Sequence, residues 1–394
     1  GTTLNFNCSD WFFFDVFGQS LPIAEDGSFY YETNLMIPGD ATLRVGRKSF
    51  EIFLVPGGEL EITFNLPEIY WSESRLFGKK DRRPLVWFEG TYAGLNTELT
   101  KYAGLMSIYS ADNFYENICG VTPAQYKKYV TKIYEKNRDE ILKNKLLSDA
   151  ARTYMINNLE MSYFFAIKGY KGTISYAPMI SGKKGVKRAD MTVGENYYDD
   201  ILRLDFIHSP YIRYGGYPDF VRAATEDFKG KFEPQPIWED ILRAKPLGSI
   251  LARLKPLSEK QMLTLDSISE PEIKKALTIR NQKVMDLLAE SAKKTGYTIC
   301  QLDTAVTADS LLAVITRPYR GKVVLIDMWN TWCGPCMRAM NSLKPVKEEL
   351  RDVIYVYVAD ESSPEGKWKI TIPDIHGIHY RITNEQSAAL GKLY

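Results

Sequence analysis

The feature that most constrains the fold is an apolar run that ends just before two closely spaced cysteines. Residues 323–329 read Val-Val-Leu-Ile-Asp-Met-Trp, and Cys333 and Cys336 follow within the sequence Trp-Cys-Gly-Pro-Cys. Such a run is typical of a strand buried on both faces of a parallel sheet. A helix is expected from about 336 to 350, and a second buried strand over 353–358. This order predicts an α/β domain with its reactive residues where the first strand ends.

The two cysteines are spaced for redox chemistry. Cysteines three residues apart at the start of a helix can close a short disulfide loop. Unpaired backbone N–H groups and the helix dipole favour an anion there, which lowers the pKa of the first thiol. We therefore predict that Cys333 attacks a disulfide and that Cys336 resolves the mixed disulfide. Trp332, Gly334 and Pro335 are expected to shape the site, and Pro335 restrains the dithiol at a position where its missing N–H costs nothing.

Asp327 is a charged residue inside the apolar run. Burying a carboxylate is costly, and desolvation raises its pKa. We interpret Asp327 as a proton acceptor for the thiol of Cys336. A solvated or capping carboxylate is the alternative interpretation.

A structural zinc site is a rival interpretation of the cysteine pair. Its remaining ligands would come from Cys300, His376 and His379. The Gly-Pro between the cysteines and the preceding strand favour redox chemistry instead. We therefore predict no metal and no other cofactor, and we expect the two histidines to lie in a loop without an assigned role.

The first 90 residues are predicted to form an antiparallel β domain. Residues 50–54 and 60–66 alternate apolar and polar side chains, with a Pro-Gly-Gly turn between them. Asp26-Gly27 is expected to separate another pair of strands, the second one covering 29–35. Short strands with regular turn signals indicate a sandwich or barrel.

Residues 91–296 are predicted to form a mainly helical domain, and 297–394 the α/β domain. Thr122-Pro123-Ala124-Gln125 is a capping box with proline at the first helical position, which predicts a helix toward Lys143. Similar signals begin at Ser258 and Ser269. Helical periodicity is also visible over 154–167 and 197–206. The fold class is therefore α+β with several domains.

Composition limits the possible partners. The 394 residues carry 50 Lys and Arg against 49 Asp and Glu, which gives a net charge of +1 and no long-range field to recruit nucleic acid. No apolar run reaches the roughly 18 residues of a membrane-spanning helix. Five cysteines are too few for a disulfide scaffold. Apart from the close pair, they are Cys8, Cys119 and Cys300, which we expect to be small buried hydrophobes.

The region from 322 to 350 resembles thioredoxins, and among them the TlpA-like thiol–disulfide oxidoreductases of the bacterial cell envelope. The matching residues are Gly-Lys-Val-Val-Leu-Ile-Asp-Met-Trp at 321–329 and Trp-Cys-Gly-Pro-Cys at 332–336. The resemblance implies that Asp327 is the buried acid of this family. The N-terminal part resembles a β-rich accessory domain found ahead of such modules, chiefly at 26–29 and 55–59.

Two departures from the family pattern matter. The family's helix has a proline five residues after the second cysteine, where this chain has Asn341, and Pro345 comes four residues later. Any kink is expected to move with it. The chain also ends at Tyr394, before the family's cis-proline loop, hairpin and final helix. We therefore expect a truncated thioredoxin-like domain, for which loss of activity is one open outcome.

The favoured hypothesis is an enzyme that reduces or exchanges protein disulfides with the help of a thiol electron donor. The resemblance implies the periplasm or cell envelope of a Gram-negative bacterium, with the signal peptide removed. The alternative is an envelope binding or assembly protein, because about three quarters of the chain lies outside the redox domain. A peroxidase of the peroxiredoxin type would use a Thr-x-x-Cys arrangement, whereas Thr331 lies two residues before Cys333.

Overall fold

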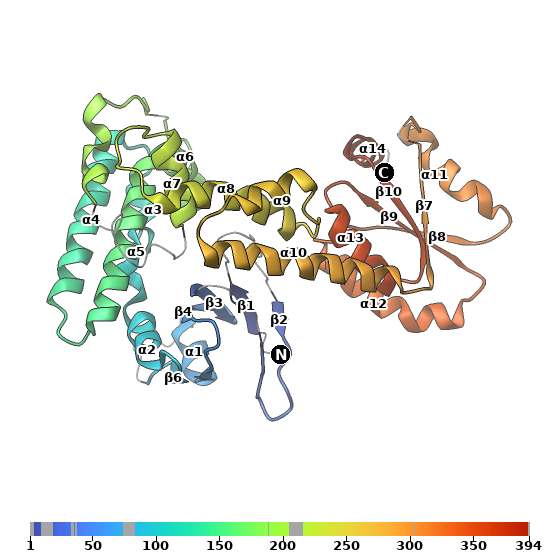
Figure 1. Cartoon of the computed structure of the whole chain (residues 1–394), viewed down its shortest axis with the longest axis horizontal. Coiled ribbons are helices and arrows are strands. Elements are labelled where there is room, and N and C mark those ends of the chain that lie inside the picture. Colours follow the sequence, from blue (N-terminus) through green and yellow to red (C-terminus); the bar gives the residue numbers. More distant parts are fainter. Residues whose placement is uncertain are drawn as a thin grey trace. The chain divides into compact units, whose positions relative to one another are not determined.

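The protein contains both helices and sheets, in agreement with the expected α+β class (Figure 1). The computed structural model describes residues 4–8, 19–32, 35, 38–73, 83–187, 189–204, 216–303 and 305–392. The chain divides into two compact units, Gly1–Lys245 and Pro246–Tyr394. The helices between 246 and 292 thus belong to the same unit as the C-terminal sheet, and the predicted domain boundaries at 90 and 296 remain a prediction.

The first unit begins with two antiparallel sheets, as the alternating pattern predicted. A four-stranded sheet has the order β2-β1-β3-β4, and a second sheet pairs β5 with β6. The strands are β1 Leu4–Cys8, β2 Gln19–Leu21, β3 Gly39–Val45, β4 Lys48–Leu54, β5 Leu60–Phe64 and β6 Val86–Gly90. Helix α1, Leu66–Glu73, follows β5. Apolar residues of both sheets share one core, because Leu43 and Phe50 pack in the same cluster as Phe88.

The strand predicted over 29–35 is absent from the residues described there, namely 29–32 and 35. The turn before it does form, because Ser28 donates from its backbone N and from Oγ to Asp26 Oδ1, at 2.9 and 2.7 Å. Phe29 and Tyr31 still pack against the β core. This segment therefore contributes side chains to the core without joining the ladder.

The remainder of the first unit is helical in its described part. Its α-helices are α2 Ala93–Tyr102, α3 Phe114–Asn117, α4 Pro123–Lys143, α5 Asp149–Lys168, α6 Tyr170–Ser181 and α7 Tyr217–Glu226, and α8 Pro236–Ala252 runs across the boundary between the units. Short 3₁₀ helices cover Ala103–Met106, Ile108–Ser110 and Glu195–Arg203. The capping box at Thr122 is present as predicted. In place of the helix predicted over 197–206, the structure has the last of these 3₁₀ helices, Glu195–Arg203. Residues 205 and 206 of the predicted helix lie outside the described part.

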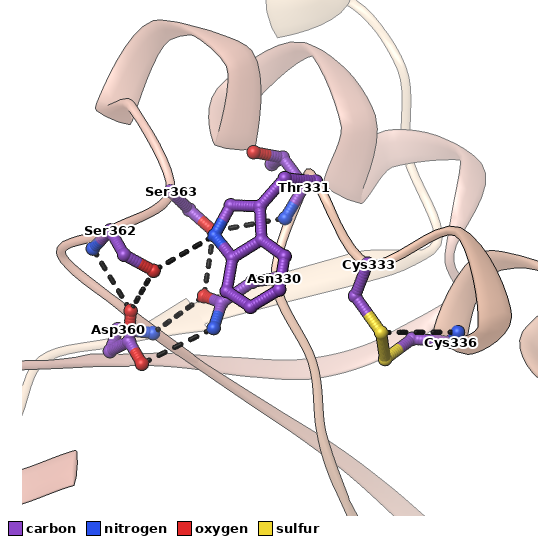
Figure 2. Close-up of a disulfide and its surroundings, with 8 residues drawn as sticks. Asn330, Thr331, Cys333, Cys336, Asp360, Ser362 and Ser363 are labelled. Carbon is purple, nitrogen blue, oxygen red and sulfur yellow. Dashed lines mark hydrogen bonds between the residues drawn. A yellow bond between two sulfur atoms is a disulfide. The ribbon is translucent and has the colours of Figure 1, made fainter. Parts of the chain in front are cut away.

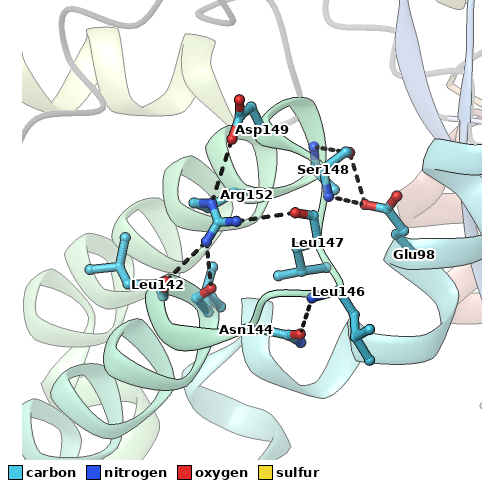
Figure 3. Close-up of polar contacts among 10 residues, drawn as sticks. Glu98, Leu142, Asn144, Leu146, Leu147, Ser148, Asp149 and Arg152 are labelled. Carbon is cyan, nitrogen blue, oxygen red and sulfur yellow. Dashed lines mark hydrogen bonds and ion pairs between the residues drawn. The ribbon is translucent and has the colours of Figure 1, made fainter.

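The turn between α4 and α5 is fixed by side-chain hydrogen bonds (Figure 3). Arg152 donates to the carbonyl oxygens of Leu142 and Leu147, at 3.0 and 3.1 Å, and so satisfies groups that a helix end leaves unpaired. Ser148 Oγ accepts from the backbone N of Ala151 and thereby caps α5. These contacts hold α4 and α5 as an antiparallel pair.

The second unit combines helices with a parallel sheet of order β7-β10-β9-β8. Its strands are β7 Tyr297–Cys300, β8 Val324–Met328, β9 Ile354–Asp360 and β10 Gly377–Ile382. Its helices are α9 Glu259–Asp266, α10 Pro271–Ala292, α11 Ala308–Thr316, α12 Gly334–Glu349, α13 Glu365–Thr371 and α14 Asn384–Leu390, with 3₁₀ turns at Arg317–Tyr319 and Ile372–Asp374. The N-cap of α10 is Glu270, one residue after the predicted Ser269.

The prediction that the strand before the cysteines is buried on both faces is wrong. Strand β8 lies at one edge of the sheet, with β7 at the other edge, and pairs with β9. Its residues are half-buried or exposed, with Met328 43% exposed and the preceding Val323 69% exposed. An apolar run indicates that its side chains tend to be buried. The position of a strand in its sheet depends instead on pairing with segments that are distant in the sequence.

Each face of this sheet carries its own core. Alternate residues of β9 point to opposite faces. Val356 and Val358 pack with Leu311 of α11, while Tyr357 packs with Met340 of α12. The cysteine-bearing helix therefore lies on the Tyr357 face. In the described part of the chain, no helix is long and apolar enough to cross a membrane.

Candidate functional site

Cys333 and Cys336 form a disulfide where the chain passes from β8 into α12 (Figure 2). Their Cα atoms are 5.3 Å apart. Cys333 is the N-cap of the helix, and its Sγ accepts a hydrogen bond from the backbone N of Cys336 at 3.3 Å. Gly334 and Pro335 form the first turn, where a proline removes no needed donor. The predicted pair is thus brought together at the positive end of a helix dipole.

The disulfide lies at the surface. Both cysteines are half-buried, and Gly334 and Pro335 are exposed. Cys336 also packs against the core on the Tyr357 face of the sheet. Trp332, in contrast, is 67% exposed. Cys333 is therefore partly accessible to solvent, next to an exposed indole.

Asp327 lies on β8 and is half-buried. Burial raises the pKa of its carboxyl group, and the positive charge of Lys347 partly offsets this. Its register partner on β9 is Tyr357, so it lies on the α12 side of the sheet. The carboxylate thus shares a sheet face with the helix that carries the cysteines.

Lys347 of α12 is a cation that the sequence interpretation did not single out. Its Nζ donates to the carbonyl oxygen of His376 at 2.8 Å. The same Nζ lies 4.8 Å from the ring centre of Tyr355 and 4.6 Å from that of Tyr357. Burial lowers the pKa of Lys347, and the charge of Asp327 acts in the opposite direction. The ammonium group is held over two tyrosine rings.

The expectation that both histidines lie in a loop is wrong for His379. It belongs to β10 and is fully buried. Its Nε2 donates to the carbonyl oxygen of Ile375 at 2.7 Å, and its ring stacks on Tyr357 with centres 5.2 Å apart. Burial lowers the pKa of His379 to about 4, so the ring is neutral at pH 7. His376 precedes β10 without belonging to it.

A network of polar side chains at the ends of β8 and β9 was missed by the sequence interpretation. Asn330 Nδ2 donates to Asp360 Oδ2 at 3.2 Å, and the backbone N of Asp360 donates to Asn330 Oδ1, also at 3.2 Å. Ser363 Oγ donates to Asn330 Oδ1 at 2.7 Å (Figure 2). Only the positions of these residues could have predicted the network, because polar residues directly after adjacent parallel strands gather at one edge of a sheet.

Among the residues described, no further ligands join the cysteine pair to make the zinc site considered above. These residues contain no group of three or more His, Cys, Asp or Glu that could hold a metal ion. Cys119 and Cys300 are free thiols, and both are half-buried rather than buried as expected. The side chain of Cys8 lies outside the described part.

Comparison with known proteins finds partial similarity to thioredoxins. The chain is 36% identical over 75 residues to a bifunctional thioredoxin reductase/thioredoxin of Mycobacterium leprae, covering 19% of this chain and 15% of that protein. It is 25% identical over 99 residues to the chloroplastic thioredoxin F of Oryza sativa subsp. japonica, covering 25% of this chain and 51% of that protein. The chain thus spans about half or less of these relatives. No family model and no solved structure matches.

Proposed function

We propose that this protein is a TlpA-like thiol–disulfide oxidoreductase that reduces or exchanges disulfides of other proteins. The observation that carries the proposal is the Cys333–Cys336 disulfide at the N-terminus of α12, half-buried and open to solvent. Partial similarity to thioredoxins supports it. The envelope of a Gram-negative bacterium is part of the same proposal and rests on the resemblance at residues 321–336.

The reaction begins with the reduced dithiol. The Cys333 thiolate attacks one sulfur of a substrate disulfide, the substrate S–S bond breaks, and one substrate thiolate leaves. The Cys336 thiolate then attacks the sulfur of Cys333, which closes the Cys333–Cys336 disulfide and releases the second substrate thiolate. Two electrons have passed to the substrate, and a thiol donor must return two electrons to the protein.

The N-terminus of α12 accounts for the order of attack. Negative charge on Cys333 Sγ is stabilised by the backbone N–H of Cys336 and by the helix dipole. Cys336 packs against the core cluster that contains Tyr357 and Met340. In this proposal Asp327 accepts the proton of Cys336, and its raised pKa brings it closer to neutral pH, where a general base works best.

Reduction of insulin by dithiothreitol tests the proposal, with the full chain as catalyst. We expect Cys333→Ser to fall to the uncatalysed rate. Reduced Cys336→Ser, mixed with insulin after removal of dithiothreitol, should accumulate a mixed disulfide. Cys300→Ser is the matched control, because Cys300 is a free, half-buried thiol of the same unit. A wild-type chain no faster than dithiothreitol alone, or a Cys333→Ser variant at the wild-type rate, would reject the proposal.

A further inference from the structure

We propose that the solvent side of α6 and the basic loop after it form a docking surface for a membrane that carries anionic lipids. This α6 surface lies in the first unit, apart from the cysteine pair. Two kinds of exposed side chain make it up: the apolar residues Tyr176, Met179 and Ile180, and the lysines Lys171, Lys183, Lys184 and Lys187.

Helix α6 has one side in the protein core and the other in solvent. Its buried residues are Tyr170, Ile174 and Ala177. Tyr176, Met179 and Ile180 are three and four residues apart, so they lie together on the opposite side. They are 60%, 71% and 52% exposed. The solvent side of a helix is usually polar, so three large apolar side chains there indicate a surface that binds something apolar.

The loop after α6 places lysines beside these apolar residues. Gly182 ends the helix in the left-handed conformation, with φ +71°. Lys183 and Lys184 therefore follow Ile180 by only three and four residues. Nζ of Lys183 donates to the carbonyl oxygen of Glu116 in α3 at 2.9 Å, which holds the start of the loop against a helix that packs on α6.

Positive charge is concentrated in this stretch of sequence. Residues 161–189 contain six Lys or Arg and no Asp or Glu, although the net charge of the whole protein is only +1. Lys168 is the one that pairs with an acid outside the stretch, Asp227, at 2.9 Å. Glu116 of α3 and Asp190 border the loop. The local excess of lysines attracts an anionic surface at short range.

Apolar side chains and cations side by side are what a membrane interface binds. Its outer hydrocarbon takes up methionine and isoleucine, tyrosine is favoured at headgroup depth, and lysine ammonium groups reach the phosphates. A second copy of the chain fits less well. A two-fold contact is self-complementary, so it would set the lysines of one α6 surface against those of the other.

The spacing of the lysines favours lipid over an acidic polypeptide. Lys183, Lys184 and Lys187 lie on an irregular loop in which Gly182 and Gly185 both have positive φ. Acidic side chains on a bound peptide would have to match this irregular spacing. Lipid headgroups are mobile within the membrane and need no fixed spacing of the cations.

Flotation of the full chain with lipid vesicles tests the inference. The probes are vesicles of phosphatidylcholine alone and vesicles of equal parts phosphatidylcholine and phosphatidylglycerol. We expect wild type to float with the anionic vesicles, to stay behind with the neutral ones, and to be released as salt rises. Lys184→Gln combined with Lys187→Gln should weaken partitioning about 30-fold, the effect of two lysines near an anionic surface.

The matched control for the lysines is Lys229→Gln combined with Lys231→Gln. Both are exposed lysines of the same unit, but acidic residues lie on either side of them in the sequence, at 226, 227 and 233. This variant should float like wild type. Equal losses in the two double variants would show that overall charge, and not the α6 surface, governs the binding, and would overturn the inference.

Met179→Ser combined with Ile180→Ser tests the apolar part. Both side chains are exposed, so the fold should tolerate the change, and partitioning should weaken about tenfold or more. Leu146→Ser is the control, because Leu146 is 72% exposed at the turn between α4 and α5. Wild-type partitioning of the α6 variant would reduce the binding to adsorption by charge and overturn the inference.

Soluble poly-glutamate is the probe for an acidic polypeptide. Binding of poly-glutamate that needs Lys184 and Lys187, without flotation on anionic vesicles, would replace the membrane by such a partner. A wild-type chain that floats with neither kind of vesicle would also overturn the inference. Cys333→Ser should float like wild type, so the inference can be judged separately from the proposed oxidoreductase function.

Discussion

Asp327 and Tyr357 are register partners on the adjacent parallel strands β8 and β9. His379 of β10 is in turn the register partner of Tyr357, so the three side chains form a row across one face of the sheet. Lys347 of α12 lies over the middle of this row, 4.6 Å from the ring centre of Tyr357. The proposed proton acceptor therefore belongs to a line of interacting groups beneath the helix that carries the cysteines.

Asp327→Asn is expected to slow the second half of the reaction. An amide cannot accept the Cys336 proton, and a general base contributes about 100-fold or more to such a step. We expect the release of the second thiol from a preformed mixed disulfide to slow by about that factor at pH 7. The first attack by Cys333 should be nearly unchanged and serves as the internal control. Equal rates of release in the two proteins would contradict the assigned role.

The same substitution should stabilise the fold at neutral pH. The pKa of Asp327 is raised in the folded state, so ionisation is easier after unfolding. Stability is therefore lost as pH rises through the unfolded pKa of about 3.9 and then through the higher folded value. Asn does not titrate. Urea titration should show Asp327→Asn more stable than wild type at pH 7, with the difference shrinking toward pH 3, and a constant difference would argue against it.

Lys347→Met should shift the pH dependence of the resolving step. The positive charge of Lys347 lowers the pKa of Asp327, so removing it raises that pKa further. Because the base must be ionised, the acid limb of the pH–rate profile should move to higher pH. Lys344→Met is the control, since Lys344 is exposed on the same helix and does not contribute to the pKa of Asp327. Identical profiles for both variants would exclude this coupling.

Signals contained within a few residues predicted local structure well. The capping box at Thr122 and the start of a helix at the cysteine pair both formed, because the groups that satisfy each helix end lie within one turn of it. The alternating runs at 50–54 and 60–66 also form strands, but β4 pairs with β3 and β5 with β6, so their pairing did not follow from the turn between them.

Features that depend on pairing between distant segments were not predictable. No local pattern states that β8 is an outer strand, that His379 is buried against Tyr357, or that Asn330 meets Asp360 across 30 residues of sequence. The order and register of the parallel strands decide each of these features. The cysteines were recognisable because their chemistry needs a fixed short spacing, whereas the groups that support them have none.

His379→Phe should make the fold less sensitive to acid. The pKa of His379 is lowered to about 4, below the usual value near 6.5, so folding favours the neutral ring. This contribution is complete above pH 6.5 and is lost as pH falls from 6.5 through 4, by about 3 kcal/mol at most. Phenylalanine keeps the ring stacking and does not titrate. The free energy of unfolding, measured with urea from pH 7 to pH 4, should fall more steeply in wild type.

That comparison needs a correction for the lost hydrogen bond to Ile375. His379→Phe removes this bond, which costs about 1 kcal/mol at every pH. Only the slope of stability against pH therefore tests the assignment. His376→Phe is a suitable control, because His376 accepts from Lys347 through its backbone carbonyl and not through its ring. Equal slopes for His379→Phe and wild type would show that the buried ring does not resist protonation.

Asp360→Asn should weaken the fold more at neutral pH than in acid. The pKa of Asp360 is lowered in the folded state, so its stabilising contribution is present above the unfolded pKa of about 3.9 and is lost as pH falls through the lower folded value. Each carboxylate oxygen now accepts from a serine hydroxyl, Oδ1 from Ser362 and Oδ2 from Ser387, and the amide places an N–H₂ donor at one of these two positions. Thermal unfolding should give a lower Tm for the variant at pH 7 and a smaller difference near pH 3. Ser387→Ala removes one of these donors and keeps the charge, so it should show a smaller loss of stability at pH 7. An Asp360→Asn protein as stable as wild type at that pH would show that the anion does not hold the ends of β8 and β9 together.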